Sequence, residues 1–161
     1  MFIEVLTESQ ADVVEALAIE IWNEHYTPII GKQQVNYMLE KFQSKEAMKE
    51  QIKNGYTYFL VEEGGCNIGY IGIELKKDEL FLSKLYIKSS ERGKGYGKKA
   101  VQFLEDLARG KKLNKISLTV NKNNVKSIAV YEKIGFKNLG SIIMDIGGGF
   151  VMDDYKMEKR I

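Results

Sequence analysis

The spacing of apolar residues changes along the chain, and each change predicts a different element. The apolar, β-prone run at residues 2–6 (FIEVL) predicts a short strand. Apolar residues then recur at helical spacing over residues 13–24, which predicts a helix that Pro28 should end. Two further helical stretches follow at residues 34–43 and 44–55. The first third of the chain therefore predicts one strand followed by two or three helices.

The middle of the chain consists of β-prone runs separated by turn residues. These runs occupy residues 56–63, 67–75 and 79–87, with a glycine pair after the first and the sequence KKD after the second. Apolar runs joined by such short turns predict an antiparallel meander.

The last third alternates between helical and β-prone patterns. It predicts a helix at residues 96–109, a strand at 115–120, a helix at 123–136, and strands at 137–146 and 150–159. The complete order of elements predicts an α+β fold built around one mixed sheet.

Composition narrows the class of protein. A chain of 161 residues, 44% of them hydrophobic, predicts a single domain over residues 1–161 with a folded core. The formal net charge is only +2, which argues against general binding of nucleic acid or membranes. The single cysteine excludes an internal disulfide, and no run approaches the roughly 20 apolar residues of a membrane span. We therefore expect a cytoplasmic protein.

Glycine and basic residues are concentrated between the third meander strand and the helix that follows it. The sequence SERGKGYGKKA (residues 90–100) contains Gly93, Gly95 and Gly97, together with Arg92, Lys94, Lys98 and Lys99. Glycines let several backbone N–H groups converge on one anion, and a helix N-terminus adds a partial positive charge. The loop is therefore suited to a pyrophosphate. The alternative is an ordinary turn with a solvated basic edge.

Two familiar phosphate-binding motifs do not match this loop. A nucleotide-triphosphatase loop counted from Gly93 would need its second glycine where the chain has Lys98. In a dinucleotide fingerprint counted from Gly95, the third conserved position falls on Ala100, where alanine is allowed. The acidic residue that this motif requires farther along the chain is replaced by Val120. Both interpretations are weak.

A third spacing fits better. The signature R/Q-x-x-G-x-G/A of the GNAT superfamily of N-acetyltransferases resembles Arg92, Gly95 and Gly97. A second segment of that superfamily, N-x-x-[AS]-x-x-x-Y-x-x-x-G-F, resembles the stretch that contains Asn124, Ser127, Tyr131, Gly135 and Phe136. Two independent motifs in the right order identify the chain as similar to this superfamily.

The resemblance implies a fold and a cosubstrate. It implies a mostly antiparallel sheet of about seven strands with helices on both faces. It also implies that the parallel strands at residues 79–87 and 115–120 splay apart around acetyl-CoA, with no metal ion. The pantetheine arm would pair with the backbone of Leu85, Tyr86 and Ile87 like an added strand. The pyrophosphate would meet the N–H groups of Arg92, Gly93, Lys94, Gly95, Tyr96, Gly97 and Lys98.

The resemblance also assigns chemical roles. Tyr131 would donate a proton to the CoA thiolate that leaves the tetrahedral intermediate. Its alternative role is an aromatic side chain packed in the core or against the cofactor. Asn124 would hydrogen-bond the cofactor arm, cap the last helix, or do both.

The general base is left open. A lysine-like amine has a pKa of about 10.4, so well under roughly one molecule in a thousand is free base at pH 7. Many relatives use a carboxylate on the strand before the glycine loop, where this chain has Ser83 and Lys84. Glu74, Glu79, His25 and water remain candidates.

The acceptor is not defined by these motifs. Segments expected to shape its pocket contain Glu20, Glu24, Glu40, Asp145, Asp153 and Asp154. An acidic lining would suit a cationic amine such as a polyamine, and the layout is similar to bacterial polyamine acetyltransferases. Peptide amines, amino sugars and antibiotics stay open as acceptors. Relatives are often dimers, so a homodimer is compatible with the resemblance.

Three functional classes therefore compete. The first is an N-acetyltransferase acting on a small-molecule or peptide amine. The second is an acyl-CoA-binding regulatory module without turnover, and the third is a phosphate-binding domain that recognises nucleotides or RNA. Thiol release from acetyl-CoA would separate the first two, and competition by ATP or RNA but not by CoA would support the third.

Overall fold

The computed structural model describes residues 1–161. Its elements are β1 (Phe2–Glu4), α1 (Glu8–His25), α2 (Thr27–Ile30), α3 (Lys32–Phe42), α4 (Lys45–Lys53), β2 (Tyr56–Glu63), β3 (Cys66–Leu75), β4 (Leu80–Ile87), the 3-10 turn η1 (Ser89–Glu91), α5 (Tyr96–Gly110), β5 (Lys115–Asn121), α6 (Val125–Ile134), β6 (Lys137–Gly147) and β7 (Phe150–Arg160). No helix is long and apolar enough to cross a membrane.

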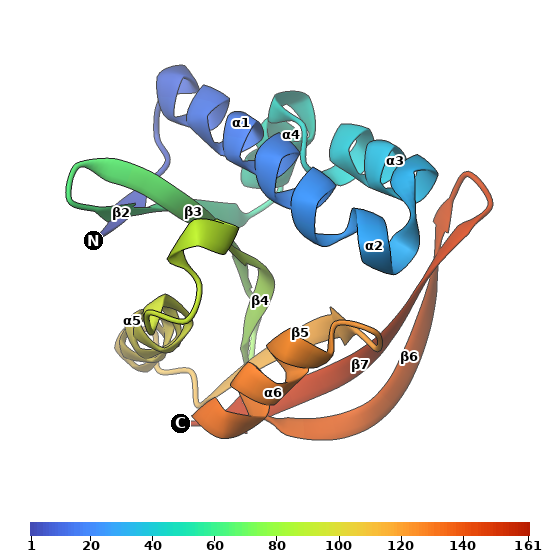
Figure 1. Ribbon diagram of the computed structural model, residues 1–161. Coiled ribbons are helices and arrows are strands. Elements are labelled where there is room, and N and C mark those ends of the chain that lie inside the picture. The colour runs from blue at the N-terminus through green and yellow to red at the C-terminus, as the bar shows by residue number, and fades with distance from the viewer. The chain divides into compact units, whose positions relative to one another are not determined.

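The seven strands form one sheet in the order β1-β2-β3-β4-β5-β7-β6 (Figure 1). The pairs β1/β2, β2/β3, β5/β7 and β6/β7 are antiparallel. The pair β4/β5 is parallel, with Leu80 opposite Ile116 and Leu82 opposite Leu118. The α+β fold with a mostly antiparallel sheet and one parallel pair is confirmed.

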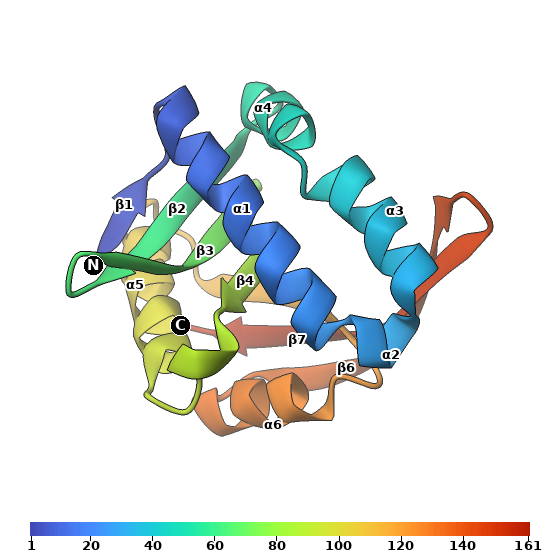
Figure 2. The same cartoon turned by 45° about the horizontal axis from the view of Figure 1, so that its top comes forward.

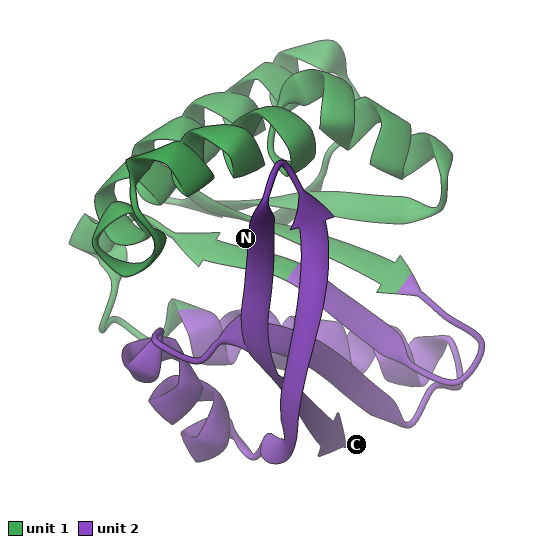
Figure 3. Ribbon diagram, turned by 90° about the vertical axis from the view of Figure 1, so that its right-hand side faces the viewer, with its two compact units in different colours: residues 1–74, 84–96 green, residues 75–83, 97–161 purple.

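Contacts divide the chain into two compact units, coloured separately in Figure 3. Unit 1 comprises Met1–Glu74 and Lys84–Tyr96, and unit 2 comprises Leu75–Ser83 and Gly97–Ile161. Strand β4 contributes residues to both units.

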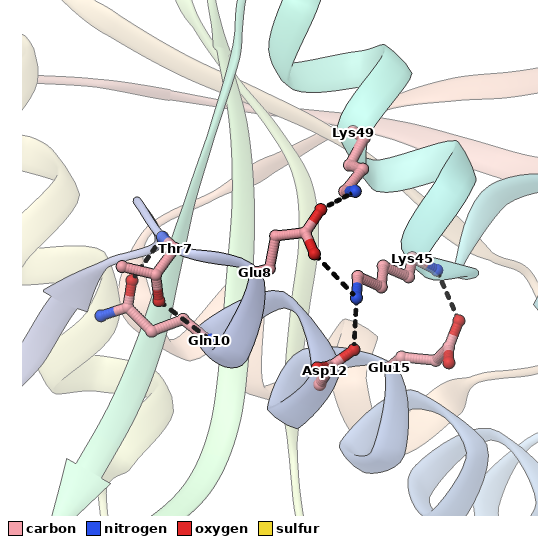
Figure 4. A network of polar contacts seen from close by, with 7 residues as sticks. All are labelled: Thr7, Glu8, Gln10, Asp12, Glu15, Lys45 and Lys49. Atoms are coloured by element: carbon pink, nitrogen blue, oxygen red, sulfur yellow. Dashed lines mark hydrogen bonds and ion pairs between the residues drawn. The ribbon is translucent and has the colours of Figure 1, made fainter.

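The start of α1 is fixed by local hydrogen bonds in unit 1. Thr7 forms a capping box with Gln10, in which the Gln10 backbone N–H donates to Thr7 Oγ1 and the Thr7 N–H donates to Gln10 Oε1 (Figure 4). Ion pairs then join this end of α1 to α4: Lys49 pairs with Glu8, and Lys45 lies 2.7 Å from Asp12. These pairs are exposed, so each contributes little to stability, but together they orient α4 along α1.

Apolar packing in unit 1 lies beneath these helices. In Figure 2, α1 crosses in front of β2 and β3. Its inward face is formed by Ala11, Val14, Leu17, Ala18, Ile21 and Trp22, all buried. These side chains, with buried residues of β2 and β3 such as Tyr58 and Tyr70, form the core of unit 1.

The sequence pattern predicted that Pro28 ends the first helix, but in the structure Pro28 lies at the start of a second, short helix. Helix α1 ends at His25, and Pro28 lies in the first turn of the four-residue helix α2. Proline is favoured there because the N–H group that it lacks would have no partner inside the helix.

Unit 2 is built on β5 and β7. Their register places Leu118 opposite Met157, and both side chains are buried. Helix α5 buries Ala100, Val101, Leu104 and Ala108. Its buried Glu105 pairs with Lys159, which ties α5 to β7.

Candidate active site

The glycine loop follows β4 and the 3-10 turn η1 and leads into α5. Gly93 has a φ of 77° and Gly95 has a φ of 86°, both in the left-handed region that favours glycine. A Cβ atom at either position would meet no atom within 4 Å, so the backbone conformation rather than crowding requires glycine. The first turn of α5 contains no acidic residue to neutralise its N–H groups. The loop therefore presents backbone donors suited to an anion.

Two basic residues of the loop are held in place within unit 1. The Arg92 Nε–H donates to the Ile87 carbonyl at 3.0 Å, and Nη1 donates to His25 Nδ1 at 3.1 Å. Lys94 lies 2.9 Å from Glu91, and this hydrogen bond raises the pKa of Lys94. Both lysine and arginine remain cationic at neutral pH, and the loop keeps its positive charge.

The C-terminal end of α1 is attached to this loop. Ser89 Oγ donates to a Glu24 carboxylate oxygen at 2.6 Å, and Lys88 lies 3.4 Å from Glu20. Arginine can only donate, so His25 Nδ1 is the acceptor of its hydrogen bond with Arg92. That lone pair is occupied, which argues against His25 Nδ1 as the general base.

The predicted pantetheine partners are the last residues of β4. The ring of Tyr86 lies 5.4 Å from Trp22, 6.0 Å from Tyr26 and 5.3 Å from Tyr70, measured between centroids. This aromatic cluster fixes the end of β4, where Leu85 and Ile87 flank Tyr86.

Tyr131 lies on α6 in unit 2. A Cβ atom added to Gly97 would lie 3.8 Å from Cγ1 of Val130, so the first turn of α5 lies close to the residue that precedes Tyr131 in α6. The Tyr131 ring is half-buried and packs edge-on against Phe136, with 5.5 Å between centroids. Helix α6 has no buried residue, so Tyr131 is not a core aromatic.

Asn124 immediately precedes α6. Its backbone N–H donates to the Asn121 carbonyl at 3.0 Å, but its side chain makes no capping hydrogen bond. The interpretation of this side chain as a helix cap is therefore wrong. The side chain is 3% exposed, so its orientation is fixed by its surroundings.

The two carboxylates considered as general bases, Glu74 and Glu79, differ in their positions and in their partners. Glu79 precedes β4 and lies 3.6 Å from Lys115, which also pairs with Glu158. Glu74 lies in β3 opposite Tyr56 of β2. Glu79 is at the opposite end of β4 from the glycine loop and is held in an ion pair, which argues for a structural role.

Lys84 is a buried amine whose surroundings could not be predicted from the sequence. Its Nζ donates to the Phe42 carbonyl at 2.6 Å, to Gln51 Oε1 at 2.9 Å and to the Tyr58 hydroxyl. Burial lowers its pKa to about 7. Burial also raises the pKa of Tyr58, which stays neutral. Lys84 thus fastens the end of α3 and the helix α4 to the strand that continues into Leu85.

Comparison with known proteins identifies the family. Residues 17–136 match the sequence model of the Acetyltransferase (GNAT) family. The chain belongs to the GNAT acetyltransferase family.

Two relatives from Bacillus subtilis (strain 168) are similar to this GNAT chain. A putative [ribosomal protein bS18]-alanine N-acetyltransferase is 29% identical over 89 residues, which are 55% of this chain and 59% of the relative. A spermine/spermidine N(1)-acetyltransferase is 33% identical over 78 residues, which are 48% of this chain and 50% of the relative. The chain thus spans only 50–59% of the length of these relatives.

Solved structures show the same fold. A PaiA N-acetyltransferase from Thermoplasma acidophilum in complex with coenzyme A has a TM-score of 0.80 at 22% identity, covering 100% of this chain and 99% of the other. A ribosomal-protein-alanine N-acetyltransferase from Brucella melitensis has a TM-score of 0.71 at 21% identity, covering 100% and 99%. At these identities the likeness concerns the fold alone.

Proposed function

We propose that the protein transfers the acetyl group of acetyl-CoA to a primary amine by direct attack on the thioester. The observation that supports this most is the loop in which Gly93 and Gly95 adopt left-handed conformations before α5. The first turn of that helix lies close to α6 next to Tyr131, since Gly97 is near Val130. The anion loop thus leads into a helix that lies near the helix that carries the phenol.

Acetyl-CoA would bind along residues that follow one another in sequence. The backbone of Leu85, Tyr86 and Ile87 would hydrogen-bond the pantetheine amides as an added strand does. The pyrophosphate would accept hydrogen bonds from the N–H groups of residues 92–98, where Arg92 and Lys94 add positive charge. Asn124 would hydrogen-bond the cofactor arm with its side-chain amide.

The chemistry requires a proton donor for the departing sulfur. The amine attacks as its free base, its lone pair forms the N–C bond, and collapse of the tetrahedral intermediate breaks the C–S bond and releases CoA thiolate. Tyr131 would give its phenolic proton to that sulfur, and the proton lost by the amine nitrogen would pass to water, from which the phenolate would be reprotonated. Its half-buried ring, packed against Phe136, keeps the hydroxyl in a limited range of positions.

The acceptor class follows from relatives whose names contain spermine and ribosomal protein alanine. Both substrates are amines, so we infer that the acceptor of this chain is also an amine. The runner-up is an acyl-CoA-binding regulatory module without turnover. A phenol directed at the sulfur is useful only if the thioester breaks, which favours the enzyme.

Thiol release from acetyl-CoA tests the proposal. The panel contains spermidine, pentylamine, glucosamine and a peptide with an N-terminal alanine, and the Gly95→Asp variant provides the matched loss of cofactor binding. We expect amine-dependent thiol release with at least one acceptor and none with the variant. Tight CoA binding without turnover on any amine would instead support the regulatory module.

A further inference from the structure

Asp154 is a buried carboxylate with no cation beside it. It is 0% exposed, and neither side-chain oxygen has a hydrogen-bond partner. The residue lies in β7, opposite Asn121 of β5 and Ile142 of β6. An ionised carboxylate removed from water is costly unless it is paired, so this position costs the fold stability.

The charged groups of unit 2 leave Asp154 uncompensated. Desolvation and, to a smaller extent, the neighbouring Asp153 carboxylate raise the pKa of Asp154 to about 6, whereas the Thr119 hydroxyl and, more weakly, Lys122 lower it. The Lys122 ammonium is engaged elsewhere: it lies 2.7 Å from Asp153 and 5.5 Å from the centre of the Tyr155 ring. Above pH 6 Asp154 is therefore mainly an anion without a cation beside it.

Apolar side chains lie next to Asp154 on one face of the β6–β7 hairpin. Met144 lies opposite Met152, two positions along each strand from Ile142 and Asp154. Since side chains alternate along a strand, these four residues share one face. They are buried or half-buried, whereas Ile143 and Val151 on the other face are 67% and 52% exposed. The shared face is an apolar strip that ends at an anion.

We propose that this face recognises the acceptor, with Asp154 binding an ammonium group and the strip of Ile142, Met144 and Met152 contacting an aliphatic chain. The inference rests on the proposed function and narrows its acceptor to small alkylamines with a flexible hydrocarbon stem. Amino sugars and peptide amines present polar groups that this apolar strip would leave unpaired. Methionine side chains are flexible, so Met144 and Met152 can move aside and let the hydrocarbon stem of the acceptor reach the buried Asp154.

The first test compares Asp154→Asn with Asp153→Asn, using pentylamine as acceptor and acetyl-CoA as donor. A hydrogen bond to a charged group is worth roughly a 10- to 100-fold change in affinity. We expect Asp154→Asn to raise KM for pentylamine by that factor, with kcat within about threefold and CoA affinity unchanged. Asp153→Asn should change KM less than about threefold. An unchanged KM in Asp154→Asn would overturn the assignment, as would a fall in kcat at constant KM.

The second test varies the acceptor chain. Each buried methylene is worth about fourfold in affinity, so kcat/KM should rise stepwise from ethylamine to pentylamine in the wild type. Met152→Ser should flatten this series, because it removes apolar surface that contacts the longer chains. A flat series in the wild type, or faster acetylation of glucosamine than of pentylamine, would contradict the inference. If no amine in the panel is acetylated, the proposed function itself fails; acetylation that is indifferent to Asp154 refutes only the present assignment.

Discussion

Asp154→Asn should remove the loss of stability that ionisation of the buried Asp154 carboxyl causes at neutral pH. The carboxyl has a pKa of about 6 in place of its ordinary value of 3.8, because burial disfavours its ionised form. An acid with a raised pKa in the folded state binds more protons there than in the unfolded state. The contribution of Asp154 to the stability of the wild type should therefore fall as pH rises from about 4 to about 6 and level off above that.

The size of the effect follows from the pKa difference. About two pH units at 1.36 kcal/mol each give roughly 3 kcal/mol of unfolding free energy lost between pH 4 and pH 7.5. The amide introduced by Asp154→Asn does not titrate, so the variant should gain that amount relative to the wild type over the same interval. Comparing the two proteins at two pH values cancels the constant effect of the substitution on packing.

Urea unfolding of both proteins at about pH 4, 5, 6, 7 and 7.5 measures this difference. Asp153→Asn is the matched control, because the Asp153 side chain is 52% exposed and pairs with Lys122. Its stability relative to the wild type should not show a step of this size and sign. A difference between wild type and Asp154→Asn that is constant with pH would refute the description of Asp154 as an unpaired buried carboxylate.

Substitutions at three further positions test the cofactor half of the site. Tyr131→Phe should lower kcat roughly tenfold or more with CoA affinity nearly kept, because only the proton donor is lost; unchanged turnover removes Tyr131 as the acid. Gly95→Asp should abolish CoA binding in calorimetry, since it places a side chain at a φ of 86° and adds negative charge to the loop; retained affinity would mean that the loop is misassigned. His25→Leu should lower CoA affinity more than His25→Asn, because only the asparagine amide oxygen can still accept the hydrogen bond from Arg92. Equal CoA affinities of the two variants would exclude this coupling.

The pattern of apolar residues predicted the order of the elements well. The meander of β2, β3 and β4 follows from short β-prone runs bounded by turn residues, and α5 begins where the glycine loop ends. These features are local, because each depends on a few consecutive residues. The same holds for Thr7, whose capping box with Gln10 depends only on residues within one helical turn.

Features that depend on tertiary contacts could not be predicted in this way. Lys84 interrupts an apolar strand, but its partners Phe42, Gln51 and Tyr58 come from three other elements. The burial of Asp154 depends on the register of β7 between β5 and β6. Asn124 has the residue type of a helix cap, yet its side chain makes no capping bond. The sequence contained a signal for Lys84, which interrupts the apolar face of Leu80, Leu82 and Tyr86. It contained none for Asp154, because charged residues follow it on the same face of β7.

A crystal structure with acetyl-CoA tests the central claim most directly. We expect the pyrophosphate oxygens within about 3.2 Å of backbone nitrogens between residues 92 and 98, and the thioester sulfur within hydrogen-bond reach of the Tyr131 hydroxyl. A pyrophosphate bound anywhere other than the turn that opens at Arg92 would contradict the assignment of the glycine loop and the proposed chemistry built on it.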